Sequence, residues 1–484
     1  MQPPKPLWSG FSYFPHQLEG IQWMLDKEIH GTFVPATDTH PDTTVYGGFQ
    51  CDDMGLGKTI QVTAVITNHV QHNTLLFAPL AMIDTWTNVL QHAGCNVYQV
   101  VDKKWTRLSS SYPIPLRFIG KRPAVYVTNY EKLMTTSTSL FTSISWNRIV
   151  LDEAHKIRNA DGRLARAAFA LVAPIRWVVT GTPLVNSLKD VVSLLHFLRV
   201  PSSSFRWEPR YLTLLPELLL HRSLDSLRGV IPDAPPVPLV HNLVLPFRTL
   251  EEEEFYHGVQ GGTEEMMLKY AKDQLSAAQS FKLLLRLRQI SVHPQIYISA
   301  KRREEANLDA EYEREDWVGS STKLDAIRDI ISTDSPSSHN YLIFCQFHEE
   351  MSLIRQSLLD LVDEDAIMMY HGALNQKERA AVLKKSKELH KKRVMLLQLQ
   401  AGGVGLNLQE YDRVIFVSPW WTAALMDQAV ARAVRMGQTS VVHVYHLSLK
   451  SEKVIESSVN IDSLVAAKAD QKRRMLERLF AICS

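Results

Sequence analysis

The sequence predicts an α/β protein with two doubly wound parallel sheets and helical insertions between them, and three observations indicate this fold class. Short apolar runs alternate with helical patterns between residues 75 and 180. The same alternation returns between residues 323 and 447. The segment 231–238, which lies between the two regions, contains four prolines, and neither a helix nor a central strand tolerates so many. Strands that alternate with helices pair in parallel, so each region is expected to form its own sheet.

The first region is expected to open with an amphipathic helix over 14–25, because its apolar residues recur at helical spacing. The next stretch, 32–44, has little periodicity and is expected to be a loop. Helical patterns follow at 58–69 and 82–90, and a leucine-rich stretch at 188–227 predicts further helices. Apolar runs predict strands at 75–78, 124–128, 148–151 and 177–180.

The second region follows two helical segments. An acidic run at 251–254 suits the start of a helix, since carboxylates are favoured at the positive end of the helix dipole. A second helical block covers 281–290, and the charged stretch 301–316 is expected to be exposed. The tail at 466–480 predicts a basic amphipathic helix, whose charged face either contacts phosphates or is only solvated. Strands are predicted at 341–345, 367–370, 394–399, 413–417 and 441–447.

The composition excludes several classes of protein. The 53 basic and 51 acidic residues leave a net charge of +2, so any binding to nucleic acid must use local patches rather than an overall basic field. The four cysteines are scattered and form no C-x-x-C pair, which argues against a disulfide framework and a zinc site. No signal peptide is recognisable, and no run reaches the ~18 apolar residues of a membrane span. We therefore expect an intracellular protein without membrane contact.

A phosphate-binding loop is predicted where Gly55, Gly57, Lys58 and Thr59 stand between an apolar run and a helical pattern. The glycines permit backbone torsions that let successive N–H groups converge on one anion. The start of the helix adds free N–H donors, the lysine supplies a cation, and the threonine hydroxyl can bind magnesium. Asp52 stands where the strict pattern has glycine, so the match is to the looser form of helicase-type ATPases. A glycine-rich turn without a nucleotide is the alternative.

A pair of carboxylates, Asp152 and Glu153, follows the strand predicted at 148–151. Ligands of open α/β sheets bind at the carboxyl ends of the strands. Asp152 can therefore reach a magnesium ion, while Glu153 orients and deprotonates a water molecule. Such pairs also occur in solvated loops, so this one indicates catalysis only together with the phosphate-binding loop. His155 has no second histidine at ligand spacing, which favours a coupling role over a metal site.

Taken in order, these motifs resemble those of the SWI/SNF helicase-like ATPases, the branch of superfamily two helicases that translocates on duplex DNA. The resemblance extends over nearly the whole chain. It is carried by Gln17, the loop 52–59, the stretches 152–159, 180–188, 285–290, 293–294, 344–347, 400–408, 419–421 and 427–429, and Arg432, Arg435, Gly437 and Gln438.

The resemblance implies two RecA-like lobes with ATP and Mg²⁺ bound in the cleft between them. Thr59 and Asp152 would hold Mg²⁺, and Glu153 would act on the attacking water. Thr180 and Thr182 would link the nucleotide site to the DNA track. The residues of lobe one that it implies for ATP binding are Gln17, Asp53, Met54, Gly55, Leu56, Gly57, Lys58 and Thr59.

Lobe two would complete the site through Gly405, Arg432 and Arg435. The two arginines are spaced i and i+3, so we expect them to project from one face of a helix. The resemblance makes them the arginine finger and its neighbour, and such a finger is worth about 10³ to 10⁵ in rate. With Lys58, Asp152 and Glu153 they are the implied catalytic residues.

The resemblance also implies contacts to duplex DNA, mostly through phosphates, so that little sequence would be read. For Trp420 and Trp421, packing and DNA contact agree equally well with the sequence, and any residue of the track could instead belong to the core. The implied contacts are Pro79, Thr128, Asn129, Tyr130, Gly402, Gly403, Trp420 and Trp421.

The chain departs from the family pattern at several positions. Cys51 replaces the usual alanine, Ser418 a common aspartate, and Thr422 and Ala423 replace asparagine and proline. Near the arginines, the segment 431–435 lacks the usual acid and histidine. None of these changes removes an atom that touches phosphate, so they bear on regulation and rate more than on the reaction.

By this resemblance the chain divides into an ATP-binding lobe one at 1–200, helical insertions and a connector at 201–320, lobe two at 321–450 and a basic tail at 451–484. It implies an ATP-dependent translocase on double-stranded DNA that remodels chromatin or other protein–DNA structures. A strand-separating DNA or RNA helicase is one alternative, and a catalytically inactive DNA-binding scaffold is another. We expect protein partners for targeting, a monomer, and either a nuclear location or a viral origin.

Overall fold

The structure is a computed structural model, and its contacts divide the chain into two units. The first unit comprises residues 1–234 and 472–484, and the second comprises residues 235–471. The residues that the structure describes are 3–36, 41–115, 118, 122–135, 139–201, 208–232, 234–270, 276–333, 339–389, 392–399, 406–450 and 460–483.

Within the described residues, the first unit is built on a nine-stranded, mostly parallel sheet. Its strands are β1 (Thr32–Val34), β2 (Thr43–Gln50), β3 (Asn73–Phe77), β4 (Asn96–Val101), β5 (Lys104–Arg107), β6 (Ala124–Thr128), β7 (Arg148–Asp152), β8 (Ile175–Val179) and β9 (Leu219–Leu220). They follow the order β1-β2-β8-β7-β3-β6-β4-β5, and β9 pairs with β2. Only the β1–β2 and β4–β5 pairs among them are antiparallel.

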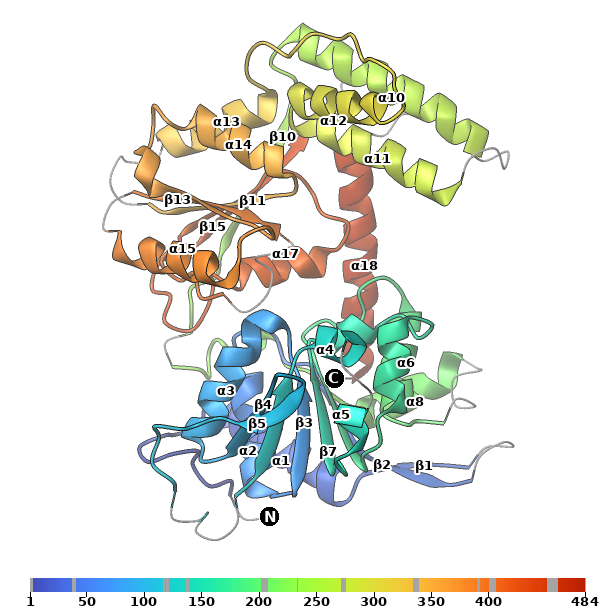
Figure 1. The fold of residues 1–484 in the computed structure, drawn as a ribbon, viewed down its shortest axis with the longest axis vertical. Coiled ribbons are helices and arrows are strands. Elements are labelled where there is room, and N and C mark those ends of the chain that lie inside the picture. The colour runs from blue at the N-terminus through green and yellow to red at the C-terminus, as the bar shows by residue number, and fades with distance from the viewer. Residues whose placement is uncertain are drawn as a thin grey trace. The chain divides into compact units, whose positions relative to one another are not determined.

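Helices cover both faces of this sheet (Figure 1). They are α1 (Pro15–Ile29), α2 (Lys58–Asn68), α3 (Ile83–His92), α4 (Tyr130–Thr135), α5 (Ser139–Thr142), α6 (Arg163–Ala170), α7 (Leu188–Phe197), α8 (Glu208–Leu218) and α9 (Leu224–Leu227), with short 3₁₀ turns at Leu80–Met82 and Ala154–Ile157. Successive strand residues alternate between the faces: Leu76 and Val150 pack with α1, α2 and α3, whereas Leu75 and Ile149 pack with α6, α7 and α8. Both faces are therefore buried, as in a doubly wound sheet.

Two expectations for this unit are wrong in part. The stretch 32–44, expected to be a loop, contains β1, because Thr32 and Val34 turn inward and pair with β2. The leucine-rich stretch 188–227 contains the short strand β9, which adds to the last two residues of β2. Pairing with β2 makes both segments strands, because neither contains a run of residues long enough to predict a strand by itself.

In the second unit, six parallel strands form a sheet within the described part of the chain, in the order β10-β15-β14-β11-β13-β12. They are β10 (Leu239–Leu245), β11 (Tyr341–Cys345), β12 (Ile367–Tyr370), β13 (Val394–Gln398), β14 (Arg413–Phe416) and β15 (His443–Leu449). The helices are α10 (Leu250–Tyr270), α11 (Ala277–Val292), α12 (Pro294–Ala306), α13 (Thr322–Thr333), α14 (His348–Ser357), α15 (Gln376–Glu388), α17 (Ala423–Val430) and α18 (Ile461–Cys483), with a 3₁₀ turn at Glu364–Ala366.

The predicted strands of the second sheet are confirmed, and two of them match to the residue, at 341–345 and 367–370. Helices α13 and α14 cover one face of this sheet, and α15 and α17 cover the other (Figure 1). Strand β10 was not predicted: it follows the proline-rich connector directly and pairs in parallel with β15. The two-sheet α/β fold class is therefore confirmed.

The last helix, α18, contributes to both units. Its first residues, Ile461 and Val465, pack with α10, α11 and α12 of the second unit. From residue 472 onward it belongs to the first unit, where Leu479 is fully buried in the core beside α7 and α8. None of the described helices combines the length and hydropathy that a membrane span requires.

Candidate functional site

The loop between β2 and α2 has the backbone geometry of an anion cradle. Gly55 and Gly57 have φ values of +90° and +82°, a region that favours glycine. A Cβ at residue 57 would lie 2.4 Å from Gln17 Nε2, so a side chain there would also displace the end of the Gln17 side chain. Gly57 is the N-cap of α2, so no side chain caps the first N–H groups of this helix. An anion can take up those donors together with the positive end of the helix dipole.

Lys58 opens helix α2 and turns its ammonium group back over the loop. Its Nζ donates hydrogen bonds to the backbone oxygens of Asp52 (2.7 Å) and Asp53 (3.2 Å). A Cβ on Gly181 would lie only 3.7 Å from the same Nζ, so the turn after β8 lies beside this lysine. The Lys58 ammonium group is therefore held at the cradle.

The first turn of α1 is bound to the same loop. Gln17 accepts a hydrogen bond from Phe14 N through Oε1 (3.2 Å) and donates to Leu56 O through Nε2 (3.4 Å). His16 Nε2 lies 3.0 Å from the same Leu56 oxygen. The structure thus brings Gln17 to the cradle, although the two lie far apart along the chain. Cys51, which precedes the loop, is buried in the core, and burial raises the pKa of its thiol well above the ordinary value.

Asp152 ends β7 as a buried carboxylate held by two donors. Trp86 Nε1 donates to its Oδ2 (2.7 Å), and Glu153 N donates to its Oδ1 (3.0 Å). Burial and the neighbouring Glu153 charge raise the pKa of Asp152 to about 7, against the opposing effects of Trp86 and Lys58. The protein therefore offsets little of the negative charge of Asp152. Such a carboxylate is suited to bind a cation that arrives together with a ligand.

Glu153 has φ +50° and ψ +49°, the left-handed conformation, which costs a residue other than glycine of order 1 kcal/mol or more. Its Oε2 lies 3.3 Å from His155 Nδ1, and the same nitrogen lies 3.4 Å from Thr180 Oγ1. Thr180 Oγ1 also accepts a hydrogen bond from Thr182 N (3.1 Å). The predicted coupling residues thus form one polar chain from the Glu153 carboxylate to the turn after β8.

The residues predicted to contact DNA from this unit lie at the carboxyl ends of β3 and β6. Ala78 N donates to Thr128 O (2.9 Å), which holds the two ends together. Pro79 and Thr128 are buried. Asn129 caps α4, because its side-chain oxygen accepts a hydrogen bond from Lys132 N (3.0 Å). Tyr130 is buried, and its hydroxyl donates to Asp152 O (2.6 Å). The side chain of Tyr130 therefore supports β7 from inside, rather than lying on a surface.

In the second unit, the expected placement of the two arginines is wrong. Helix α17 ends at Val430, so Arg432 and Arg435 lie in the turns that follow it and not on one helix face. The backbone leaves the helix because Arg432 O accepts a hydrogen bond from Leu408 N (3.1 Å). Arg432 is buried, and burial lowers the pKa of Arg435. Gly402, Gly403 and Gly405 lie outside the described residues.

Trp420 and Trp421 are partly exposed and lie beside an arginine of α11. The Arg288 guanidinium lies 4.9 Å from the Trp420 ring centre and 5.8 Å from that of Trp421, within cation–π range. Its Nη2 also donates to Pro419 O (3.0 Å). Burial lowers the pKa of Arg288 to about 10. Packing therefore covers part of the surface of each indole, and the rest of that surface is accessible to solvent.

Sequence reasoning missed two residues that hold this site. Trp86 appeared only as an apolar residue of a helical pattern, and Arg222 lay in a stretch expected to be helical. A polar atom on an otherwise core-facing tryptophan is a weak signal, since buried indoles usually find a partner anyway. Only the fold brings Trp86 to Asp152 and Arg222 to Asp52.

Two family models match the chain. One, for the SNF2-related domain, matches residues 16–296, more than half of the sequence. The chain belongs to the SNF2-related family. A second model, for the helicase conserved C-terminal domain, matches residues 322–437. With both domains present, this SNF2 protein is a helicase-like ATP hydrolase.

Several curated relatives resemble this SNF2 protein. The putative ATP-dependent helicase/translocase YwqA of Bacillus subtilis is 26% identical over 90% of this chain and 46% of its own length. The probable global transactivator of Orgyia pseudotsugata multicapsid polyhedrosis virus is 27% identical over 96% of this chain and 91% of its own length. The chromatin remodeling factor mit1 of Schizosaccharomyces pombe is 24% identical over 98% of this chain and 34% of its own length. The chain thus spans less than half of two of these relatives and most of the viral one.

Among solved structures, the SWI2/SNF2 ATPase core of Sulfolobus solfataricus in complex with dsDNA is 21% identical, with a TM-score of 0.40. The match covers 100% of this chain and 99% of that chain.

Proposed function

We propose that this SNF2-family ATPase hydrolyses ATP to translocate along double-stranded DNA and thereby remodels chromatin or other protein–DNA structures. The observation that best supports the proposal is the support of Asp152. Its side chain is held by Trp86 and its backbone by Tyr130. These two residues follow the ends of β3 and β6, where the DNA-contacting segments are proposed. A shift of either segment would therefore act directly on the strand that carries the catalytic pair.

The nucleotide is proposed to lie against the first unit. The loop residues 53–59 would bind the phosphates through backbone N–H groups, and Lys58 would exchange its contacts with Asp52 O and Asp53 O for the phosphate oxygens. Gln17 would contact the adenine, which requires its weak 3.4 Å bond to Leu56 O to be replaced. Glu153 would orient the attacking water and accept its proton.

Magnesium is proposed to be held by Thr59 and Asp152 together with the phosphates. The residues present fit this ion, because Mg²⁺ is usually bound by one or two carboxylates, substrate phosphates and waters rather than by a protein cage. When bound, Mg²⁺ would neutralise charge on the phosphate oxygens.

Arg432 and Arg435 of the second unit are proposed to stabilise the charge that develops on the transferred phosphate, as arginine finger and neighbour. Gly405 is proposed to contact the nucleotide. The DNA track is proposed to include Pro79, Thr128 and Asn129, with Gly402, Gly403, Trp420 and Trp421 from the second unit. Most of these contacts would reach phosphates, so affinity should depend strongly on salt and weakly on sequence.

The decisive experiment measures the ATPase rate of the purified protein alone and with single-stranded DNA, duplex DNA or duplex RNA at one salt concentration. Stimulation by duplex DNA, together with displacement of a triplex-forming strand, is the expected result. Displacement should fail in Glu153→Gln, which keeps the shape of the side chain but removes the base.

Three other results would change the assignment. Preference for single strands or RNA, together with separation of a forked duplex, would indicate a strand-separating helicase. Activities that are unchanged in Glu153→Gln would indicate a DNA-binding scaffold that uses no hydrolysis. Turnover only after addition of a cell extract would indicate a required protein partner, and we propose such partners for targeting to DNA in a nucleus or on a viral genome.

A further inference from the structure

A segment far from the phosphate loop in the sequence runs along its beginning. Strand β9 (Leu219–Leu220) pairs in parallel with the last residues of β2. The pairing continues beyond the strand, because Cys51 N donates to Leu220 O (2.8 Å) and Asp53 N donates to Arg222 O (3.0 Å). The first residues of the loop are thus hydrogen-bonded to a neighbouring backbone before the glycines begin.

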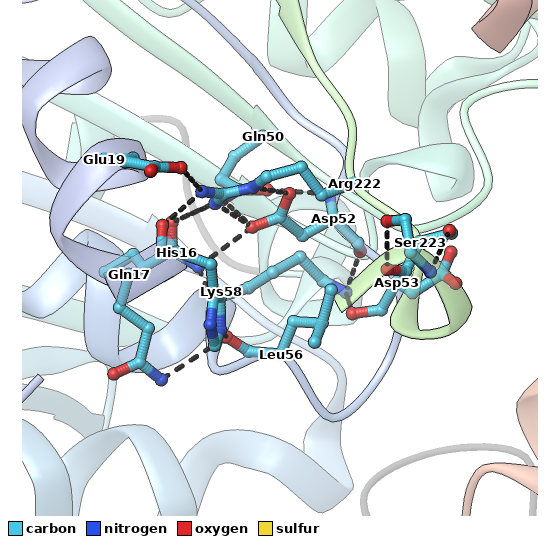
Figure 2. A network of polar contacts seen from close by, with 12 residues as sticks. His16, Gln17, Glu19, Gln50, Asp52, Asp53, Leu56, Lys58, Arg222 and Ser223 are labelled. Atoms are coloured by element: carbon cyan, nitrogen blue, oxygen red, sulfur yellow. Dashed lines mark hydrogen bonds and ion pairs between the residues drawn. The ribbon is translucent and has the colours of Figure 1, made fainter. Parts of the chain in front are cut away.

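The side chain of Arg222 then reaches over the loop to Asp52 (Figure 2). Its Nε lies 3.0 Å from Asp52 Oδ1 and its Nη2 lies 2.5 Å from Oδ2, a bidentate pair. Gln50 and Gln61 also donate to Oδ2, at 2.9 and 3.0 Å. Asp52 is fully buried, so every one of these partners comes from the protein. The Asp52 carboxylate thus points toward these side chains in the interior of the first unit, and not toward the cradle.

The charge state of Asp52 follows from these contacts. Burial alone would raise the pKa of the Asp52 carboxyl, but the hydrogen bonds and charge of Arg222, with those from Gln50 and Gln61, hold it below the ordinary value. The Asp52 carboxyl is therefore ionised at neutral pH. Removing one partner would leave an uncompensated buried charge, which is far more costly than removing both.

Arg222 also reaches helix α1, which carries Gln17. Its Nη1 donates to His16 O and lies 3.7 Å from Glu19 Oε2, while Nη2 contacts Gln61 Oε1 of α2 (3.2 Å). Gly20 of α1 makes room for this approach, because a Cβ there would lie 2.6 Å from Arg222 Nη2. One guanidinium thus connects α1, the phosphate loop and α2.

We propose that Arg222 is a positioning residue for ATP: it fixes the phosphate loop relative to α1 and α2, and Asp52 replaces the glycine of the strict pattern as its anchor. This inference rests on the proposed nucleotide site. The Lys58 ammonium group donates hydrogen bonds to the backbone oxygens of Asp52 and Asp53. Because the Arg222 guanidinium fixes this part of the loop, it also fixes the position of that ammonium group. A loop ordered before ATP arrives loses less conformational freedom on binding.

The test compares steady-state kinetics and nucleotide binding of Arg222→Gln with the unaltered protein. We expect the KM for ATP and the Kd of a fluorescent ATP analogue to rise about tenfold, the size of effect that ordering one loop has on binding. The kcat should change less than about threefold, since the groups around the reacting phosphate remain. Arg228→Gln is the matched control: Arg228 lies on the same segment and pairs with the exposed Asp225, so both constants should be unchanged.

A second variant separates positioning from stability. Arg222→Gln alone leaves the buried charge of Asp52, and part of its effect, or a failure to fold, would come from destabilisation. The double variant Asp52→Asn/Arg222→Gln removes both charges and should melt within ~5 °C of the unaltered protein. We expect its KM to stay raised about tenfold. A KM that returns to the original value in the double variant would show that the pair only stabilises the fold.

Lys58→Ala distinguishes failure of this inference from failure of the proposed nucleotide site. Loss of ATP binding in Lys58→Ala with an unchanged KM in Arg222→Gln overturns the role of Arg222 alone. ATP binding and hydrolysis that persist in Lys58→Ala overturn the nucleotide site itself.

Discussion

Trp86 Nε1 lies 2.7 Å from Asp152 Oδ2, so an indole of α3 holds the carboxylate that ends β7. Trp86 is fully buried, and α3 begins one residue after the 3₁₀ turn Leu80–Met82, which follows Pro79. A neutral donor to a buried carboxylate orients it without removing its negative charge. Asp152 is therefore held in place while it remains available to a cation.

Trp86→Phe removes this donor and keeps an aromatic side chain, although a smaller one. We expect kcat for ATP hydrolysis to fall about tenfold and the Mg²⁺ concentration for half-maximal rate to rise, since a hydrogen bond to a charged group contributes about 1.5 to 3 kcal/mol. Steady-state rates over a magnesium titration measure both effects. Trp105→Phe is the control, because it removes an indole bond to Leu140 O in the same unit, away from the carboxylates. Equal losses in the two variants would contradict a specific role for Trp86.

Glu153→Gln should lower kcat by about 10² to 10⁴ while ATP still binds, because the amide cannot accept the proton of the attacking water. Binding of a fluorescent ATP analogue and single-turnover phosphate release separate the two steps. His155→Ala should have a smaller effect on the basal rate, since His155 contacts Glu153 and Thr180 and leaves the Glu153 carboxylate itself in place. Loss of nucleotide binding in Glu153→Gln would show that the carboxylate has a structural role instead.

Arg432→Ala and Arg435→Ala test the proposed finger and its neighbour. The variant that removes the finger should lose about 10³ to 10⁵ in kcat with an unchanged affinity for ATP, because the interaction forms only in the transition state. Arg355→Ala, which removes an exposed pair with Glu364 in the same unit, is the control and should keep full activity. A rise in KM with unchanged kcat would assign both arginines to ground-state binding.

A fully buried ion pair lies in the first unit. Glu28 and Arg148 are both fully buried, and Glu28 also accepts hydrogen bonds from His69 (2.6 Å) and Trp177 (2.8 Å). Glu28→Ala should lower the free energy of unfolding by about 3 to 5 kcal/mol, because Arg148 is left buried and uncompensated. Urea unfolding measures the loss. Glu217→Ala, which removes a largely exposed partner of Lys27, should cost less than about 1 kcal/mol.

The second unit should lose stability in mild acid through His293. Burial lowers the pKa of His293 to about 4, with a smaller opposing effect from the charge of Asp325. Between pH 6.5 and 4 the unfolded chain therefore binds a proton that the folded unit does not, and stability falls as the pH falls. The expected loss from pH 7 to pH 5 is about 2 kcal/mol.

The control for this prediction is His293→Asn. His293 Nδ1 accepts Gln295 N (3.1 Å) at the start of α12, and asparagine can cap that helix without titrating. Urea unfolding of the variant should be about 2 kcal/mol less sensitive to pH over the same interval. An unchanged pH dependence would place the titration on another group.

Local patterns were sufficient for much of this protein. The strand at 341–345 is an unbroken apolar run, and the glycines at 55 and 57 take the positive φ values that their place before a helix predicted. The helix at 58–69 was predicted almost to the residue as α2 (Lys58–Asn68). Such features depend on neighbours a few residues away, which is why the sequence alone determined the fold class and the position of the glycine-rich loop before α2.

Tertiary structure decided which distant side chains support that loop and the carboxylate at the end of β7. Arg222 and Asp52 are 170 residues apart, and Trp86 and Asp152 are 66 apart. The first contact exists because β9 pairs with β2. The second exists because α3 packs against the face of the sheet to which β7 contributes Val150. The end of α17 at Val430, which removes the arginines from a helix, likewise depends on a bond from Leu408 N. No periodicity encodes these pairings, since hydrogen bonds and ion pairs between remote segments form only after the apolar faces have fixed the order of the strands.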